Sequence, residues 1–126
     1  MSSLLLDTNV VIWLLLGDRD SVTGHAEEAM LDEDNPIFVS AVVHWEIAVK
    51  RSLGRLEIGD GWAKAIARLG FIQMPITSRH SAAVEHLPWH HRDPFDRLLI
   101  AQAQTEDQVL VSADTRIPLY DVEVLW

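Results

Sequence analysis

The sequence predicts an α/β fold in which helices cover both faces of a central parallel sheet. Short apolar runs that read as buried strands, such as Leu4–Leu6 and Val109–Val111, alternate with longer segments that carry helix caps. This alternation is typical of parallel sheets, because each helical crossover returns the chain to the same end of the sheet. With 126 residues, of which 48% are hydrophobic, we expect one domain over residues 1–126 with a sizeable core.

Capping residues and chain breakers set the expected elements. Gly17 and Gly54 are preferred at helix C-termini, Ser40 is a preferred N-cap, and Asp93-Pro94 favours a helix start. Pro75 shortens its strand or places it at a sheet edge. The predicted strands are Leu4–Leu6, Ile37–Val39, Phe71–Ile76, Val109–Val111 and Val122–Leu125. The predicted helices are Thr8–Leu16, Ser21–Leu31, Ala41–Leu53, Trp62–Leu69, Ser78–Leu87 and Pro94–Glu106.

Composition excludes several classes of protein. The formal net charge of −9 argues against a broad, sequence-independent grip on nucleic acid, which needs a basic surface. The chain has no cysteine, so it has neither disulfides nor thiolate metal sites. It lacks the basic start of a signal peptide and any apolar run near the roughly 20 residues that span a bilayer. We therefore expect a cytoplasmic protein that does not contact membranes.

Two acidic residues come directly after predicted strands. Asp7 follows Leu4–Leu6, and Asp114 follows the run that begins at Val109. In open α/β sheets, ligands bind in the crevice beyond the carboxyl ends of the strands. Each acid has a second interpretation, since Asp7 could cap the first helix and Asp114 could cap the following turn.

Two further acids lie on predicted helices. Asp96 is the third residue of the helix that Asp93 caps, where the helix dipole keeps a carboxylate ionised, so it suits a cap and a metal ligand equally. Glu46 lies in the middle of an apolar helix, where its alternative is a weak pair with Lys50. Four such carboxylates stay ionised together only if cations offset their repulsion. Oxygen ligands favour Mg²⁺, with Mn²⁺ as an alternative, and such an ion suits phosphodiester chemistry.

Four stretches of the chain resemble one known family. They are Leu6-Asp7-Thr8-Asn9, Trp45-Glu46-Ile47-Ala48-Val49-Lys50, the block from Arg92 to Ala103 (RDPFDRLLIAQA), and Val111-Ser112-Ala113-Asp114. Together they resemble the PIN domain and, more narrowly, the VapC-type toxins of bacterial toxin–antitoxin pairs. The resemblance covers nearly the whole chain, and its most specific part is Arg-Asp-Pro-Phe-Asp-Arg.

The resemblance implies a three-layer α/β/α sandwich and a Mg²⁺-dependent endoribonuclease that cleaves RNA with a metal-activated water. It assigns the catalytic and metal-binding acids to Asp7, Glu46, Asp96 and Asp114, with Asp93 as a further candidate. Thr8 and Ser112 would orient these carboxylates, and Arg92 and Arg97 would contact RNA phosphate. The implied partners are RNA, a cognate antitoxin that itself binds operator DNA, and a second copy of the chain in a homodimer.

The sequence leaves some interpretations open. Trp89 is expected in a loop, where it could stack on an unpaired base, whereas Trp45 is expected in the core. His44, His90 and His91 are expected at loops or surfaces rather than in catalysis. One alternative function is a PIN-like binding module without catalysis. Another is a phosphatase with an aspartyl nucleophile, although Asn9 stands where that class has a second aspartate.

Overall fold

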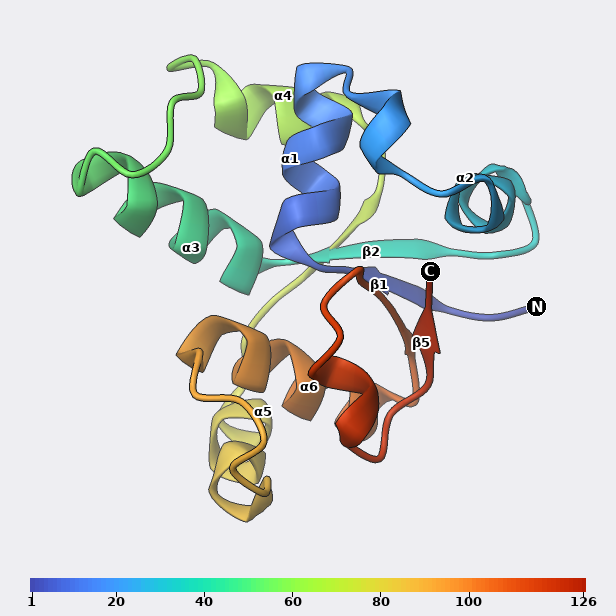
Figure 1. The fold of residues 1–126 in the computed structure, drawn as a ribbon, viewed down its shortest axis with the longest axis vertical. Coiled ribbons are helices and arrows are strands. Elements are labelled where there is room, and N and C mark those ends of the chain that lie inside the picture. Colours follow the sequence, from blue (N-terminus) through green and yellow to red (C-terminus); the bar gives the residue numbers. More distant parts are fainter.

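A five-stranded parallel sheet forms the centre of the molecule. The computed structural model describes residues 1–126, and its strands are β1 (Leu4–Leu6), β2 (Ile37–Ser40), β3 (Ile72–Met74), β4 (Val109–Val111) and β5 (Val124–Leu125). Their order across the sheet is β3-β2-β1-β4-β5, and every neighbouring pair is parallel. The predicted α/β class with a parallel sheet is therefore confirmed (Figure 1).

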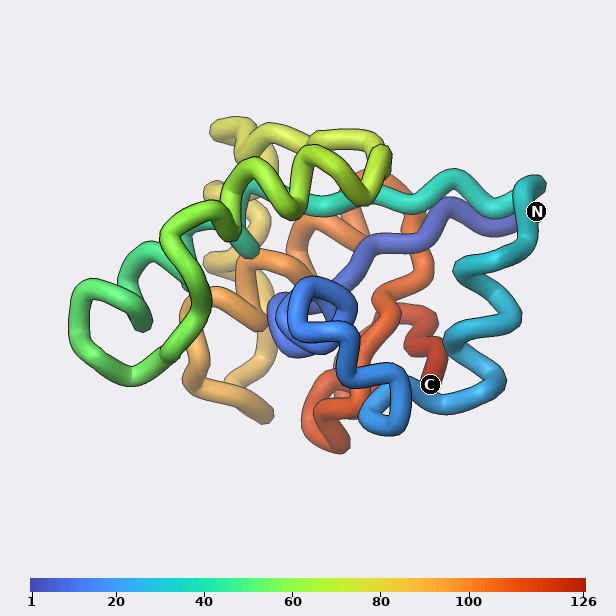
Figure 2. Tube along the Cα trace, turned by 90° about the horizontal axis from the view of Figure 1, so that it is seen from above, coloured from blue at the N-terminus to red at the C-terminus, as the bar shows by residue number.

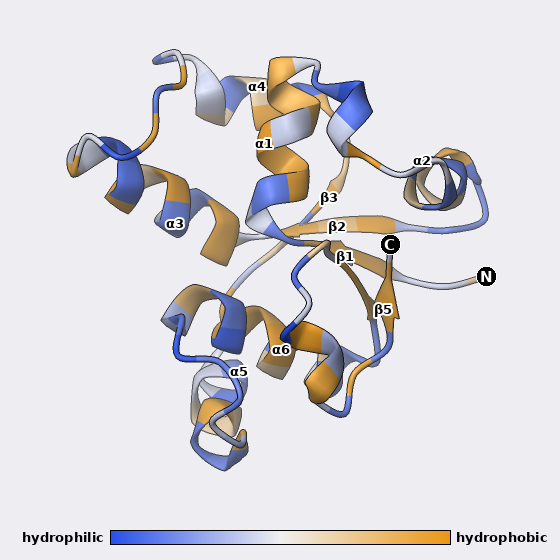
Figure 3. Cartoon of the chain, in the orientation of Figure 1, coloured by the Kyte–Doolittle hydropathy of each residue, from blue (hydrophilic) through white to orange (hydrophobic).

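Alternating residues of β1 separate the core into two clusters. Leu4 and Leu6 join one cluster, which includes residues of α1 and α3, whereas Leu5 joins the other, which is built largely on α6. This alternation follows from the pleat of a strand, which points successive side chains to opposite faces. Strands β1, β2 and β5 are mostly hydrophobic, whereas α1 begins with a hydrophilic turn and continues in hydrophobic ones (Figure 3). The result is the expected three-layer α/β/α sandwich.

Six α-helices flank the sheet: α1 (Thr8–Leu16), α2 (Gly24–Leu31), α3 (Ala41–Ser52), α4 (Trp62–Arg68), α5 (Ser78–Ala83) and α6 (Pro94–Glu106). The bounds predicted for α1 and α6 are confirmed at both ends. Gly17 ends α1 in the left-handed conformation, with φ of 68°. Ser40 caps α3 by accepting a hydrogen bond from the Val42 amide.

Helices α3 and α4 end one residue earlier than predicted, and α2 and α5 differ from their predicted bounds by more. The helix expected from Ser21 begins at Gly24, since Thr23 accepts the Ala26 amide as its N-cap and a 3₁₀ turn, Arg19–Ser21, precedes it. The helix expected to reach Leu87 changes at Val84 into the 3₁₀ turn Val84–His86. Pro75 restricts β3 to three residues at the sheet edge, as its lack of an amide hydrogen predicts.

The strand order reverses direction between β1 and β4. The chain builds β1, β2 and β3 outward on one side, then returns to place β4 and β5 on the other side of β1. Such a reversal opens a crevice at the carboxyl ends of the two central strands, where α/β proteins bind ligands. The two chain ends lie on the same side of the molecule in both ribbon and tube views (Figure 2). No helix has the length and apolar character needed to cross a bilayer.

Candidate metal centre at the carboxyl edge of the sheet

Asp7 and Ser112 meet where the strand order reverses. Leu6 pairs with Val111 across the β1–β4 ladder, so the two residues that follow these strands lie opposite each other. The Val10 amide donates to Asp7 Oδ1 (2.9 Å), so Asp7 is indeed the N-cap of α1. The Ser112 side chain also hydrogen-bonds Asp7, which is only 5% exposed. The Asp7 carboxylate therefore both caps α1 and lies in the crevice.

Glu46 reaches the same crevice from α3. Its side chain is buried, and Thr8 Oγ1 donates to Glu46 Oε1 (2.6 Å). The Lys50 ammonium, one helical turn further on, pairs with Glu46 Oε2. Both interpretations of Glu46 hold in part, because it pairs with Lys50 but lies in the crevice rather than on the surface. The Thr8 hydroxyl therefore fixes the orientation of the Glu46 carboxylate.

Asp96 enters from the first turn of α6. The Asp93 side chain caps this helix by accepting the Phe95 and Asp96 amides (2.8 and 3.1 Å). His91 Nε2 lies 2.7 Å from Asp96 Oδ2 and 3.3 Å from Asp114 Oδ2. His91, Asp96 and Asp114 each offer one ligand atom, and these three atoms lie within 4.8 Å of one another. Asp93 is not part of this cluster, and its role here is the cap.

Asp114 completes the cluster from the loop after β4. Its amide donates to Ser112 Oγ (3.1 Å), which links the loop to the hydroxyl beside Asp7. Asp114 Oδ1 accepts the Arg116 amide (2.8 Å) and the Arg116 guanidinium. Asp114 therefore caps its turn, as the second interpretation held, while its Oδ2 faces His91.

Burial changes the protonation of the two central acids. Burial raises the pKa of Asp7 to about 6 against the lowering effect of the Ser112 and Val10 hydrogen bonds, and the charges of Glu46 and Asp114 raise it further. Burial and the neighbouring Asp93 charge likewise raise the pKa of Asp96 to about 6. Partial burial also raises the pKa of Asp114, but hydrogen bonds and charge from Arg116 outweigh it and lower that pKa overall.

The donor set fits a divalent cation. Lys50 pairs with Glu46 and Arg116 pairs with Asp114, but no lysine or arginine pairs with Asp7 or Asp96. Asp7 is buried and Asp96 is half-buried, and a carboxylate taken out of water in this way is costly to ionise without an opposite charge beside it. A divalent ion with oxygen ligands would offset both charges. Asp96 and Asp114 lie close enough together, with His91, to hold one ion, and Asp7 and Glu46 lie near enough for their charges to act on Asp96.

Arg97 does not have the role predicted for it. Its guanidinium is only 3% exposed and donates to the carbonyls of Val84, Leu87, Pro88 and His91 and to the Tyr120 hydroxyl. It also lies 3.7 Å from the centre of the Trp89 ring, as a cation–π contact. With its donors engaged in this way, Arg97 holds the loop that carries His91 instead of contacting phosphate. Arg92 is exposed and remains a candidate for RNA contact.

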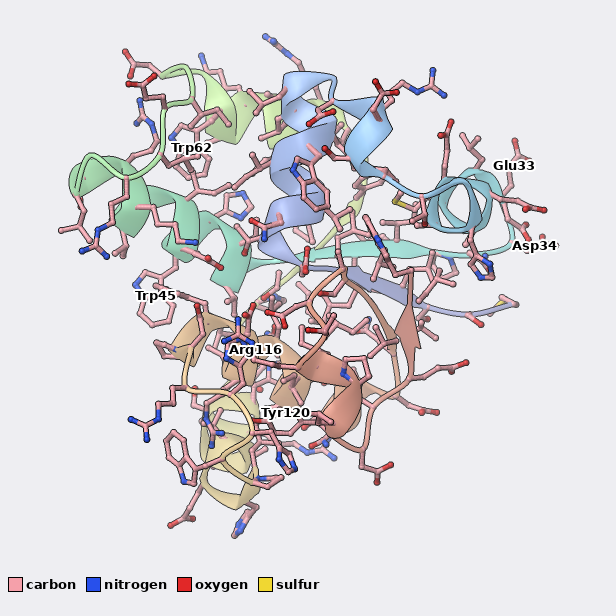
Figure 4. The ribbon with its side chains drawn as sticks, in the orientation of Figure 1. Glu33, Asp34, Trp45, Trp62, Arg116 and Tyr120 are labelled. Carbon is pink, nitrogen blue, oxygen red and sulfur yellow. The ribbon has the colours of Figure 1, made fainter.

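The aromatic residues near the acids also depart from expectation. Trp45, predicted in the core, is 46% exposed and projects outward from α3 (Figure 4). It contacts Phe95 edge to face, with ring centres 4.5 Å apart. The pair thus joins α3 to the first turn of α6, the two helices that carry Glu46 and Asp96. Trp89 is exposed as predicted, although Arg97 covers one face of its ring.

Two residues of this site, His91 and Arg116, were not predicted to belong to it. His91 is buried in the cluster rather than at a loop surface. A signal was present, because a residue just ahead of the Asp93 cap must lie near the first turn of α6 and hence near Asp96. Arg116, which pairs with Asp114, gave no comparable signal, because its position depends on the turn that Asp114 caps.

Comparisons with known proteins agree with the fold. The family model described as PIN domain matches residues 4–123. A structure of VapBC2 from Rickettsia felis bound to a promoter DNA fragment has a TM-score of 0.72, with 14% identity over 96% of each chain. DNA-bound VapBC from Salmonella typhimurium gives 0.64, with 14% identity over 98% of this chain and 97% of that one. FitAcB from Neisseria gonorrhoeae gives 0.57, with 19% identity over 96% and 95%. No curated protein matches the chain.

The raised pKa values predict how stability depends on pH. Between about pH 4 and 6 the folded state keeps protons on Asp7 and Asp96 that the unfolded chain has lost, so stability falls as pH rises. From pH 5 to 7 we expect the chelator-treated protein to lose about 2–3 kcal/mol through these two groups, measured by urea unfolding. Asp7→Asn should remove roughly half of this loss. Equal pH profiles for the variant and the parent would contradict the account.

The buried guanidinium predicts a large difference between two nearby arginines. Arg97→Ala leaves several loop carbonyls without their donor and should lower the free energy of unfolding by roughly 2–4 kcal/mol. Arg92→Ala is the matched control and should change it by less than about 0.5 kcal/mol, because Arg92 is exposed. Similar small effects for both variants in chemical denaturation would show that Arg97 does not hold the loop.

Proposed function

The chain belongs to the PIN domain family, a family of nucleases, and from that premise we propose that it is a divalent-metal-dependent endoribonuclease. We further propose that it is the toxin of a type II toxin–antitoxin pair. The observation that carries the proposal is the convergence of Asp7, Glu46, Asp96 and Asp114 at the carboxyl edge of the sheet. These side chains come from four separate parts of the sequence and share a site in which two of them lack a cationic partner.

Each residue of the cluster has a distinct part in the proposed reaction. Asp7, Asp96 and Asp114 would hold the ion, while Thr8 and Ser112 fix the orientation of Glu46 and Asp7. When bound, a divalent ion would lower the pKa of a water molecule and offset the negative charge on a phosphodiester. Arg92 and Arg116 are exposed next to the cluster and would attract the phosphates on either side of the cleaved bond.

Partner surfaces of the chain support the toxin–antitoxin part of the proposal. The solved structures with similar folds are VapBC and FitAB complexes. An open groove of about 770 Å³ lies between α1, α3 and the segment before α4, with apolar residues Leu16, Ala48, Leu56, Ile58 and Trp62 along it. The formal charge of −9 favours a basic partner. We propose that an antitoxin segment binds this groove and that DNA contact occurs through the antitoxin.

A second apolar hollow supports the proposed homodimer. It lies between α1 and α2, and Leu31, which is 73% exposed, forms part of its wall together with Trp13, Leu14, Val22, Met30 and Phe71. An exposed apolar face of this kind is typical of a protein interface. We propose it as the contact between two copies of the chain.

The phosphatase alternative finds little support in the site. That reaction needs an acid two residues after the nucleophile to protonate the leaving group, and here this position is the exposed Asn9. Asp7 itself accepts the Val10 amide and is almost wholly buried. A PIN-like binding module without catalysis differs from the nuclease only in turnover, which the next experiment measures.

Loss of one central carboxylate should abolish RNA cleavage. We expect Asp96→Asn to lower the rate of metal-dependent cleavage of single-stranded RNA by roughly 100-fold or more, because it removes a ligand charge from the cluster. The matched control is Asp107→Asn, at the exposed C-terminal end of the same helix, where asparagine tolerates the left-handed φ of 53°. It should cleave like the parent protein. Cleavage that survives both Asp96→Asn and chelation would contradict the metal mechanism, and no cleavage by the parent would favour the binding module.

The exposed Trp45 ring predicts a separate effect on RNA binding. Trp45→Ala should weaken binding of a fluorescent single-stranded RNA to the Asp96→Asn protein by about 5- to 100-fold, because it removes a surface on which a base can stack. Leu53→Ala is the matched control, since Leu53 is an exposed apolar residue at the far end of α3. Equal affinities for both variants would show that Trp45 does not contact the bound RNA.

A further inference from the structure

His91 is the one nitrogen donor in the acidic cluster, and its side chain points into it. The ring is 4% exposed, and its Nε2 lies 2.7 Å from Asp96 Oδ2 and 3.3 Å from Asp114 Oδ2. We propose that His91 Nε2 is a direct ligand of the divalent ion, beside Asp96 and Asp114. The site would then have a mixed nitrogen and oxygen donor set and would select a transition-metal ion such as Mn²⁺ over Mg²⁺. This inference rests on the proposed function, because it names the metal chemistry of that same site.

The spacing of the three donor atoms fits ligands of one ion. Two ligands bound about 2.1 Å from an octahedral ion, at right angles to each other, lie about 3 Å apart. The distances from His91 Nε2 to the two carboxylate oxygens bracket that value. Small rotations of the side chains would therefore allow one ion to bind all three atoms, in place of the direct contacts between the imidazole and the carboxylates.

Two hydrogen bonds fix the backbone of His91. The His91 amide donates to the Tyr120 hydroxyl (2.9 Å), and Arg97 donates to the His91 carbonyl (3.3 Å). Both partners are buried, and neither contact involves the ring nitrogen that faces Asp96 and Asp114. These contacts preorganise the backbone of the loop that carries the His91 ring.

The tautomer required for binding is accessible. As a ligand through Nε2, the neutral ring would carry its proton on Nδ1. The Asp93 amide lies 3.5 Å from Nδ1, at the outer limit for a hydrogen bond, so this contact opposes that tautomer only weakly.

The donor set determines which ions the site prefers. Imidazole nitrogen suits first-row transition metals, whereas Mg²⁺ prefers oxygen ligands and retains several waters. A site with Asp96 and Asp114 alone would favour Mg²⁺, as the sequence predicted. Addition of His91 shifts the preference toward Mn²⁺, and this shift can be measured as binding, independently of any cleavage.

Pulsed EPR of the Mn²⁺-loaded full chain tests the assignment directly. A bound imidazole gives a ¹⁴N coupling to Mn²⁺, which we expect in the parent protein and in His90→Asn, the matched control at the exposed neighbouring histidine. The coupling should be absent in His91→Asn. By calorimetry, His91→Asn should weaken Mn²⁺ binding by roughly tenfold or more and Mg²⁺ binding much less. If His91→Asn does not fold, ¹⁵N-histidine labelling of the parent protein replaces it, since the ¹⁴N coupling must then become a ¹⁵N coupling.

The outcomes separate this inference from the proposed function. Mn²⁺ bound in the parent protein without an imidazole coupling would overturn the ligand role of His91 and leave the carboxylate site standing. An unchanged preference between Mn²⁺ and Mg²⁺ in folded His91→Asn would overturn the claim of selectivity. Failure of the parent protein to bind any divalent ion would remove both the inference and the metal-dependent nuclease.

Discussion

Repulsion among buried carboxylates is the constraint on which the rest of this structure depends. The reversal of strand order between β1 and β4 brings Asp7 and the Ser112–Asp114 loop together, and α3 and α6 add Glu46 and Asp96. The chain relieves part of the repulsion itself, through Lys50 on Glu46 and Arg116 on Asp114. The pKa values of Asp7 and Asp96 are raised first by burial and further by the negative charges that remain around them. An unrelieved negative charge in a crevice is what a divalent cation binds.

The support around the cluster consists of polar groups that are themselves buried. Thr8 fixes Glu46, Ser112 connects Asp7 to the Asp114 loop, and Arg97 fixes the carbonyls ahead of α6. Each of these groups acts on the position of another residue rather than on a substrate. Such support keeps catalytic or ligand side chains within the small tolerances that metal chemistry needs.

Most of the architecture could be predicted, because capping residues and short apolar runs act locally. Thr8–Leu16 and Pro94–Glu106 have the bounds expected from Asp7, Gly17 and Asp93. The prediction was wrong where two local signals competed, as at Thr23 and Val84. Arg97 and His91 were misjudged for a different reason, since burial of a polar side chain depends on the carbonyls and carboxylates that the tertiary fold brings to it. Trp45 was misjudged because apolar neighbours in sequence do not fix which side of a helix is covered.

Anomalous diffraction from crystals grown with Mn²⁺ tests the central claim most directly. The account predicts a strong anomalous peak at the carboxyl edge of the sheet, within ligand distance of Asp7, Asp96 and Asp114. A well-ordered crystal with no peak at this edge, in which these carboxylates turn away from one another toward helix caps and arginines, would contradict it.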